Sequence, residues 1–329
     1  MRRLPALSLL ARSATLACAL APALAACGPN AGGGDDDDDG PRIDAGPGGP
    51  DATPTEQCRK MDLVFVIDDS GSMSEEQDSL SVNFPMFANL LNDYRLASGE
   101  LLDYRAAITT SGITASYVIV LPAIPPFPEM RIPQSQTGAD GKFRQTCGMT
   151  RPWLERTDPN MPATFACAAR VGTGGPAIEM PLRAAELSVQ PATNAGFVRE
   201  DALLGIIMIT DEDDCSRRNS PFETGGDACA ENGDTDIASI PSFVTGFDQL
   251  KGERGRWASA TIAGPAECMS AFGNAADAVR MKQFVQAAGT NSVFGDICLG
   301  NLAPALQEAL DTFQAACENF PPIGREVPP

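Results

Sequence analysis

The sequence predicts an α/β fold in which a mostly parallel sheet is flanked by helices. Two continuous apolar runs, at residues 63–67 and 203–209, are typical of strands that are buried on both faces of a parallel sheet. Between residues 58 and 317, segments with helical periodicity alternate with further apolar segments, as in α/β proteins. Polar residues follow both apolar runs directly, which is expected at the carboxyl ends of parallel strands.

The first apolar run leads into a predicted helix. This helix should begin after Ser74, where Gln77 is placed to complete a capping box. Pro85 lies inside the helix and should kink it or delay its regular start. Apolar residues then recur every three or four positions, which defines one helical face. That face consists of Leu80, Phe84, Phe87, Leu91 and Tyr94.

The alternation of strands and helices continues along the chain. Residues 104–110 and 116–121 are predicted to be further strands. Pro176 is suited to the first position of a helix, where its missing N–H is not needed. Later segments are predicted to be a strand at 257–262, a helix at 275–288, a strand at 293–297, and a last helix with Leu302, Leu306, Leu310, Phe313 and Cys317 on one face.

The composition excludes several functions. Because the 329 residues include no histidine, Ser/His and Cys/His nucleophile pairs, histidine general bases and histidine-ligated zinc sites are all excluded. A formal net charge of −19 argues against nucleic-acid binding, which depends on Lys and Arg neutralising phosphates. The chain also lacks a nucleophile elbow and a P-loop. We therefore expect a protein that is not an enzyme.

Residues 1–26 are predicted to be a signal peptide. A basic start precedes an Ala/Leu-rich stretch that is too short to span a membrane. The stretch ends in the sequence LAAC at residues 24–27, which resembles the lipobox of bacterial lipoproteins. This resemblance implies cleavage before Cys27 and lipidation of Cys27. Because Gly28 follows, it also implies sorting to the outer membrane of a Gram-negative bacterium. The alternative is an ordinary secretory signal with an accidental cysteine.

The rest of the chain divides into three predicted parts. Residues 27–57 are predicted to be a disordered acidic tether, because they contain many Gly, Pro and Asp and almost nothing apolar. A Ca²⁺ site in the run Asp35–Asp39 is the less favoured alternative, since a disordered run lacks a fixed geometry. Residues 58–319 are predicted to form one domain with a Pro-rich insertion at about 122–172. Residues 320–329 would be a tail.

The cysteines predict disulfides. Of ten cysteines, Cys18 and Cys27 belong to the signal and the lipobox, which leaves an even number in an exported chain. Close spacing favours two local pairs. The first strand begins just after Cys58 at the amino edge of the sheet, and a last helix antiparallel to the strands would end near Cys317 at that edge. The predicted bonds are Cys58–Cys317, Cys147–Cys167, Cys215–Cys229 and Cys268–Cys298.

Candidate ligands for a metal gather where the two buried strands end. Asp68, Ser70 and Ser72 follow the first strand, and Asp211 follows the second. Because both exits lie at the carboxyl edge of a parallel sheet, these side chains can meet in one crevice. Carboxylate and hydroxyl oxygens are hard ligands, so they suit Mg²⁺, Mn²⁺ or Ca²⁺ rather than zinc or copper.

These residues carry a resemblance to a known family. Residues 64–73, VFVIDDSGSM, resemble the D-x-S-x-S signature of von Willebrand factor type A domains. The loop at 172–175 is similar to the family's threonine loop, and residues 206–211 are similar to its later strand ending in T-D. The resemblance implies a doubly wound, Rossmann-like sheet with a metal ion-dependent adhesion site. The implied ligands of Mg²⁺ (or Mn²⁺ or Ca²⁺) are Asp68, Ser70, Ser72, Thr173 and Asp211.

The resemblance also implies a function. A coordination position left open on the metal would accept an Asp or Glu of a protein partner, in adhesion or complex assembly by an envelope lipoprotein. Parts of residues 122–172 are expected to border the metal crevice and to set partner choice. Asp69 is expected to be a solvated loop residue, and residues 212–214 a solvated turn. The alternatives are a structural envelope lipoprotein with a non-functional metal site and a metal-dependent hydrolase.

Overall fold

The computed structural model describes residues 58–96, 98–225, 236–270 and 273–321. The predicted signal peptide and tether, Cys229 and most of the predicted tail lie outside the described residues, so the predictions made for them stay predictions. None of the helices in the four described ranges is long and apolar enough to cross a membrane.

A six-stranded sheet forms the centre of the domain. Its strand order is β11-β8-β6-β1-β2-β5, and every neighbouring pair is parallel except β2 and β5. This confirms the predicted α/β fold. Strand order reverses at β1, since the chain continues to β2 on one side and later to β6 on the other. The strands are β1 (Lys60–Ile67), β2 (Asp103–Thr110), β5 (Leu154–Glu155), β6 (Leu203–Ile209), β8 (Trp257–Ala263) and β11 (Ser292–Asp296).

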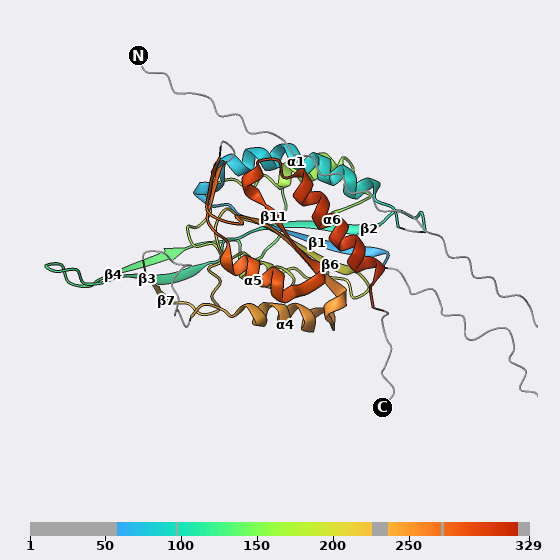
Figure 1. The fold of residues 1–329 in the computed structure, drawn as a ribbon. Coiled ribbons are helices and arrows are strands. Elements are labelled where there is room, and N and C mark those ends of the chain that lie inside the picture. Colours follow the sequence, from blue (N-terminus) through green and yellow to red (C-terminus); the bar gives the residue numbers. More distant parts are fainter. Residues whose placement is uncertain (1–57, 97, 226–235, 271–272, 322–329) are drawn as a thin grey trace, which may run out of the picture. The chain divides into compact units, whose positions relative to one another are not determined.

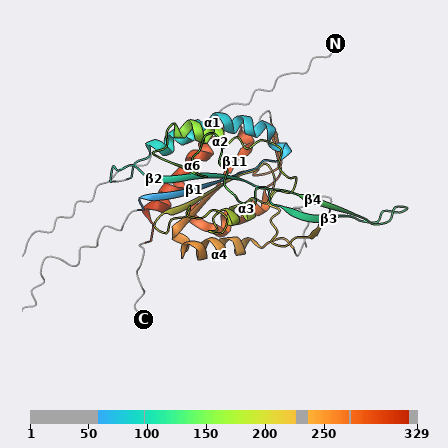
Figure 2. The same cartoon turned by 180° about the vertical axis from the view of Figure 1, so that it is seen from behind.

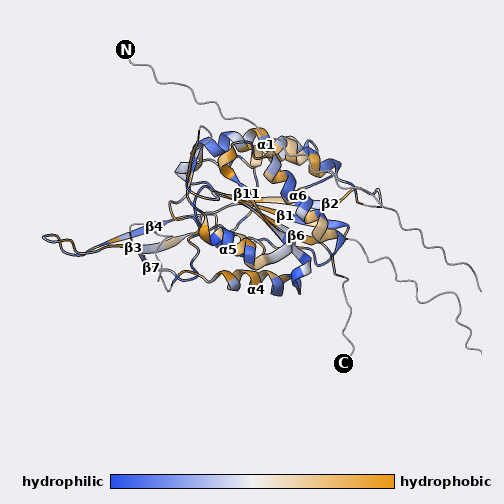
Figure 3. Cartoon of the chain, viewed as in Figure 1, coloured by the Kyte–Doolittle hydropathy of each residue, from blue (hydrophilic) through white to orange (hydrophobic). Residues whose placement is uncertain are grey.

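Helices cover both faces of this sheet (Figures 1 and 2). One face packs against α1 (Ser74–Asp93), α2 (Met161–Ala168) and α6 (Ala303–Glu318). The other face packs against α3 (Pro181–Ser188), α4 (Ile240–Lys251) and α5 (Val279–Ala288). The strands of the sheet are largely hydrophobic, while the helices also carry hydrophilic residues (Figure 3).

The two-sided burial explains why β1 reads as a continuous apolar run. Leu63 and Phe65 belong to the core on one face, while Val64 and Val66 belong to the core on the other. The Phe65 ring lies 4.8 Å from the ring of Phe165 and 5.4 Å from that of Phe87, in edge-on contacts that tie β1 to α2 and α1. Residues 63–67 are therefore apolar on both sides of the sheet, and the buried Asp62 near the start of β1 is compensated by an ion pair with Arg199 (2.8 Å).

The predicted start of α1 is wrong in one respect. No side chain caps this helix, and the Gln77 amide donates to the Asp68 carbonyl (2.9 Å) instead of completing a capping box. A short 3₁₀ helix, η1 (Gly71–Met73), precedes α1, and the helix continues through Pro85. Gln77 therefore fixes the loop that follows β1 rather than the helix end.

Two predicted helix starts are also wrong. The helix expected from Pro176 begins at Pro181, because Glu179 pairs with Gly112 and the Met180 amide donates to the Ser111 carbonyl (3.1 Å). The helix expected from residue 275 begins at Val279. The residues before it form a small antiparallel pair, β9 (Cys268–Ser270) and β10 (Gly273–Ala275).

The strand predicted at 116–121 exists but lies outside the central sheet. β3 (Ala115–Leu121) pairs antiparallel with β4 (Met130–Gln136) and parallel with β7 (Phe222–Thr224) in a sheet of three strands. β3 and β4 form a hairpin that projects beyond the helices at one end of the domain (Figures 1 and 2). The predicted insertion therefore extends outward only up to Gln136, whereas the rest of it includes β5 of the central sheet and α2 of the core.

Three of the predicted disulfides are present. Cys58 and Cys317 are bonded with their Cα atoms 5.1 Å apart, which ties the residues before β1 to the end of α6. The other two bonds join Cys147 to Cys167 and Cys268 to Cys298. The fourth predicted pair includes Cys229, outside the described residues.

Candidate metal centre

The candidate centre lies where β1 and β6 end side by side. The two strands are in parallel register up to Ile67 and Ile209, so the loops that follow them start next to each other. The Asp68 amide donates to the Ile209 carbonyl (2.9 Å), which continues the pairing one residue beyond the strands. This is the position at which strand order reverses, where open α/β sheets bind ligands.

Asp68 is fully buried and held by three donors. One carboxylate oxygen accepts from the Ser70 amide (2.9 Å) and from the Ser111 hydroxyl (3.1 Å). The other oxygen accepts from the Thr210 hydroxyl (2.6 Å). These donors come from the ends of β1, β2 and β6, so three neighbouring strands fix the orientation of this carboxylate.

Ser70, Ser72 and Asp211 form a connected group beside Asp68. The hydroxyls of Ser70 and Ser72 lie 2.9 Å apart. Burial raises the pKa of Asp211 to about 7, the charge of Asp68 adds to this increase, and the neighbouring Ser72 hydroxyl lowers the pKa. The Oδ1 atom of Asp211 is buried and has no hydrogen-bond partner in the described structure. The structure thus brings together four of the five predicted ligands.

The structure does not bring Thr173 into this group. Thr173 is exposed, and within the described residues it makes no hydrogen bond to the other predicted ligands. Its loop does approach the centre, because the Gly175 amide donates to the Asp69 carbonyl (2.6 Å). A Cβ atom at Gly175 would lie 2.3 Å from the Asp69 carboxylate, so only glycine fits there. A ligand role for Thr173 stays a prediction.

Residues at the end of β2 contribute to the centre, and the sequence analysis missed them. Ser111 donates to Asp68, as described above. Burial raises the pKa of Asp69, and the neighbouring Thr110 hydroxyl lowers it. The signal was available, because Thr110 and Ser111 directly follow an apolar segment predicted to be a parallel strand. A neighbouring strand of a parallel sheet ends at the same edge.

Further buried carboxylates lie near the centre. Burial, reinforced by the charges of Asp68 and Glu212, raises the pKa of Glu179 to about 10. Both side-chain oxygens of Glu179 are buried without a hydrogen bond within the described ranges, as is one oxygen of Glu76. Carboxylates buried together in this way are costly unless a cation or protons compensate their charge.

The donor set fits a hard divalent cation. It offers hydroxyl and carboxylate oxygens, including the unpartnered Asp211 oxygen, and no sulfur or imidazole. Among the described residues, no group of three or more Asp, Glu or Cys side chains is arranged to hold a metal ion by itself. A cation at this position would therefore depend on the hydroxyls of Ser70 and Ser72 together with the carboxylates.

Asp69 is not the solvated loop residue that was expected. It is half-buried between the ends of β2 and the loop at 172–175, and its Oδ1 atom is buried without a hydrogen bond in the part of the chain that the structure describes. The positive charge of Arg144 acts on it. Arg144 belongs to the predicted insertion, and whether residues 122–172 border the metal crevice stays a prediction. Their role in partner choice also stays a prediction.

Residues 212–214 do not form a solvated turn. Asp214 is fully buried, accepts from the Leu182 amide (3.1 Å) at the start of α3, and pairs with Arg280 (3.0 Å). Asp213 accepts from the backbone amides of Arg280 (2.9 Å) and Met281 (3.2 Å) near the start of α5. The acidic side chains at 213 and 214 therefore hold two helix starts against the carboxyl edge of the sheet.

The buried carboxylates predict a specific pH dependence of the metal-free protein. The folded pKa of Asp211, about 7, lies above its ordinary value of 3.8, so the folded state binds the proton more tightly than the unfolded state. The resulting stability is present in acid and is lost as the pH rises through 7. In EDTA, the free energy of unfolding in urea should therefore fall between pH 5 and pH 8 because of Asp211. This fall should be roughly 2–3 kcal/mol smaller in Asp211→Asn than in the wild type. Equal differences in both proteins would contradict this.

Comparison with known proteins adds little to this description. No protein-family model matches the chain, and no curated protein matches it. Among solved structures, the manganese-loaded TRAP protein of Plasmodium vivax is 12% identical with a TM-score of 0.33, and the alignment covers 75% of this chain and 74% of that one. The pilus adhesin SpaC of Lactobacillus rhamnosus GG is 11% identical with a TM-score of 0.40, and the alignment covers 80% of this chain and 30% of the adhesin.

A further similar structure is proximal thread matrix protein 1 from the mussel byssus, which is 11% identical with a TM-score of 0.38. The alignment covers 78% of this chain and 49% of the mussel protein, so the chain spans about half of that protein's length. At these scores the similarities carry no argument about function. The fold and the centre define the class of the protein: an α/β domain with a doubly wound, mostly parallel sheet and a candidate cation centre at its carboxyl edge.

Proposed function

We propose that this chain is a protein-binding module of the von Willebrand factor type A kind, which binds its partner through a divalent cation. The cation is Mg²⁺, or else Mn²⁺ or Ca²⁺. A lipid on Cys27 would hold the module in the cell envelope, at the outer membrane, for adhesion or complex assembly. The observation that carries the proposal is the junction of β1 and β6, where Asp68, Ser70, Ser72 and Asp211 meet around an unpartnered carboxylate oxygen.

The residues of the centre suit recognition of a carboxylate. The bound cation would supply a positive charge that attracts an anionic oxygen. Ser70 and Ser72 are neutral donors of oxygen, and Asp68 shares its charge among three hydrogen bonds. The protein therefore neutralises the cation only in part. Since the domain is strongly acidic, the remaining anionic oxygen would come from an Asp or Glu of a protein partner.

The first test removes one hydroxyl at a time. Ser70→Ala and Ser72→Ala should each lower the affinity for Mg²⁺ roughly tenfold, because each removes an oxygen ligand without changing the charge of the centre. Titration calorimetry with MgCl₂ measures this affinity. Ser98→Ala, at an exposed position near the amino edge, is the matched control and should bind Mg²⁺ like the wild type. An unchanged affinity in both site variants would contradict the proposed centre.

One observation favours a second candidate function. Thr173 is exposed and makes no hydrogen bond to the other four residues within the described structure, as expected if the site is non-functional and the chain is a structural envelope lipoprotein. The two functions differ in calorimetry, since the structural candidate releases no heat on addition of Mg²⁺. They also differ in the capture of envelope proteins on the chain, which EDTA should abolish only if the cation is part of the contact.

A further inference from the structure

The hairpin of β3 and β4 is held firmly at its base. Gly112 and Gly138 are in close contact there, since a Cβ atom on Gly138 would lie 2.0 Å from the backbone of Gly112. The Asp140 carboxylate accepts from the amide (2.6 Å) and the hydroxyl (2.9 Å) of Thr114. The ring of Tyr117 stacks on Phe222 at 5.5 Å. The hairpin is therefore fixed in direction relative to the central sheet.

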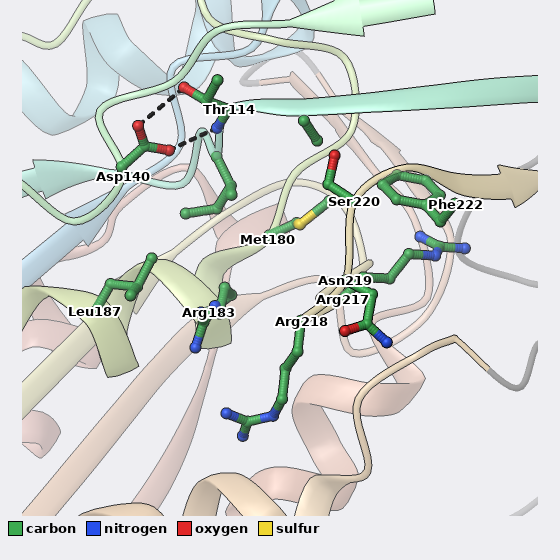
Figure 4. Close-up of a pocket in the computed structure, with 12 residues that line it drawn as sticks. Thr114, Asp140, Met180, Arg183, Leu187, Arg217, Arg218, Asn219, Ser220 and Phe222 are labelled. Carbon is green, nitrogen blue, oxygen red and sulfur yellow. Dashed lines mark hydrogen bonds between the residues drawn. The ribbon is translucent and has the colours of Figure 1, made fainter. Parts of the chain in front are cut away.

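A cavity of about 290 Å³ lies beside this base. Figure 4 shows Thr114 and Asp140 at one side of it and three arginines at the other. The arginines are engaged elsewhere: Arg183 and Arg218 both pair with Glu186, and Arg217 lies 4.3 Å from the ring centre of Phe222. The residues that line the cavity therefore help to hold the base of the hairpin in place.

The tip of the hairpin is apolar and exposed. Residues 121–128, with the sequence LPAIPPFP, contain no charged residue. Ile124 is 67% exposed and Phe127 is 70% exposed, and Met130 just beyond them is 49% exposed. Such side chains are normally buried in a core or an interface. In Figure 3 hydrophobic and hydrophilic colours alternate at the far end of the hairpin, because proline counts as hydrophilic on that scale.

The backbone of the tip is also suited to removal from water. The Ile124 amide donates to the Phe127 carbonyl (3.1 Å), and the Phe127 amide donates to the Ile124 carbonyl (2.7 Å). Half of the residues in 121–128 are prolines, which have no N–H group. Few donors therefore remain to be desolvated when the tip is covered, which lowers the cost of burial.

The tip and the candidate metal centre belong to one end of the molecule. β2 ends at Thr110, Ser111 binds Asp68, and β3 begins at Ala115, so the hairpin leaves the sheet at the edge that carries the centre. The seven residues of β3 add about 23 Å of reach beyond that edge. A single partner domain of ordinary size spans such a distance.

We propose that the hairpin tip, residues 121–130, is a second contact for the same protein partner that supplies the carboxylate to the metal centre. This inference rests on the proposed function. The partner would combine an exposed Asp or Glu with an apolar socket for Ile124 and Phe127, about 25 Å away. Two separated contacts of different chemistry select a partner by geometry as well as by charge.

The charge of the domain favours a protein over a lipid surface as the occupant of the tip. Loops that insert into bilayers are normally flanked by Lys or Arg, which bind anionic lipids. Here Glu129 adjoins the tip, and Arg131 is already paired with Glu129 and Glu223. The acidic domain behind the hairpin would repel an anionic membrane.

The experiment selects binders to the full chain in Mg²⁺ from a phage-displayed library of random 20-residue peptides. The affinities of the enriched peptides are then compared between Phe127→Ser, Ile124→Ser and the wild type. Val82→Ser is the matched control, because Val82 is 76% exposed on α1, away from the hairpin. We expect Phe127→Ser to weaken binding at least tenfold, EDTA to abolish it, and Val82→Ser to leave it unchanged.

Each other outcome has a distinct meaning. Binders that require Mg²⁺ but bind Phe127→Ser and Ile124→Ser like the wild type would overturn this inference and leave the proposed function intact. Binders that require the tip but ignore both EDTA and Asp68→Asn would overturn the shared contact, and the proposed function with it. Co-sedimentation with vesicles of 70% phosphatidylcholine and 30% phosphatidylglycerol, lost in Phe127→Ser, would identify a lipid surface as the occupant and overturn the inference.

Discussion

Asp68→Asn is expected to lower the affinity for Mg²⁺ at least 100-fold. Asn has nearly the same shape as Asp, but the substitution removes one of the two negative charges next to Ser70 and Ser72. A divalent cation depends on that charge, so the loss should exceed the effect of removing a hydroxyl. The measurement is calorimetric titration with MgCl₂ at pH 7.5.

The same substitution should separate metal binding from folding. With Mg²⁺ at 100 times its dissociation constant, the wild type should gain about 2.7 kcal/mol of stability, and Asp68→Asn should gain almost none. In EDTA the two proteins should agree within about 1 kcal/mol, because removing a buried charge near Asp211 offsets a weaker set of hydrogen bonds. Asp93→Asn, at the exposed end of α1, is the control and should respond to Mg²⁺ like the wild type. Equal stabilisation of Asp68→Asn and the wild type by Mg²⁺ would contradict the proposed metal centre.

Loss of the Cys58–Cys317 bond is expected to lower the free energy of unfolding by roughly 5–6 kcal/mol in the chain-entropy model. This bond joins residues 259 positions apart. Breaking it therefore increases the conformational entropy of nearly the whole domain in the unfolded state. The Cys147–Cys167 bond spans only 20 positions, and its loss should cost about 3 kcal/mol in the same chain-entropy model.

Urea unfolding of the two double alanine variants tests this order. Both cysteines of the long-range pair are 3% exposed, and alanine leaves a small cavity that adds to the loss. If both variants lost the same stability, the entropy of the unfolded chain would not be the main contribution of the long-range bond.

The sequence predicted the central sheet well because its strands are buried on both faces. Residues 63–67 of β1 and the whole of β6 are apolar, so both are visible as uninterrupted apolar runs, although β1 also contains Lys60 and Asp62 near its start. The same burial places polar residues at the strand ends, and Asp68 and Asp211 could be found in this way. The bond between Cys58 and Cys317 followed from the direction of one strand and one helix.

Features that depend on contacts between distant segments could not be predicted in this way. The strand at β3 has an ordinary strand sequence, and nothing in it shows that it leaves the central sheet to pair with β4 and β7. Asp213 and Asp214 look like exposed loop residues until α3 and α5 are placed against them. Burial of Glu179 likewise depends on where the chain runs before α3.

The arrangement of β1 has a mechanical consequence. The chain enters the domain at Cys58, runs along β1 and reaches the candidate metal centre at Asp68, so a partner that pulls on the centre pulls directly along this strand. Both neighbours, β2 and β6, are parallel to β1 and paired along almost its whole length, so their hydrogen bonds resist the load together, in shear, rather than opening one at a time. The Cys58–Cys317 bond fastens the point of entry to α6. Tension between the partner and the chain before Cys58 would thus act on a short, laterally supported segment and bypass the rest of the domain.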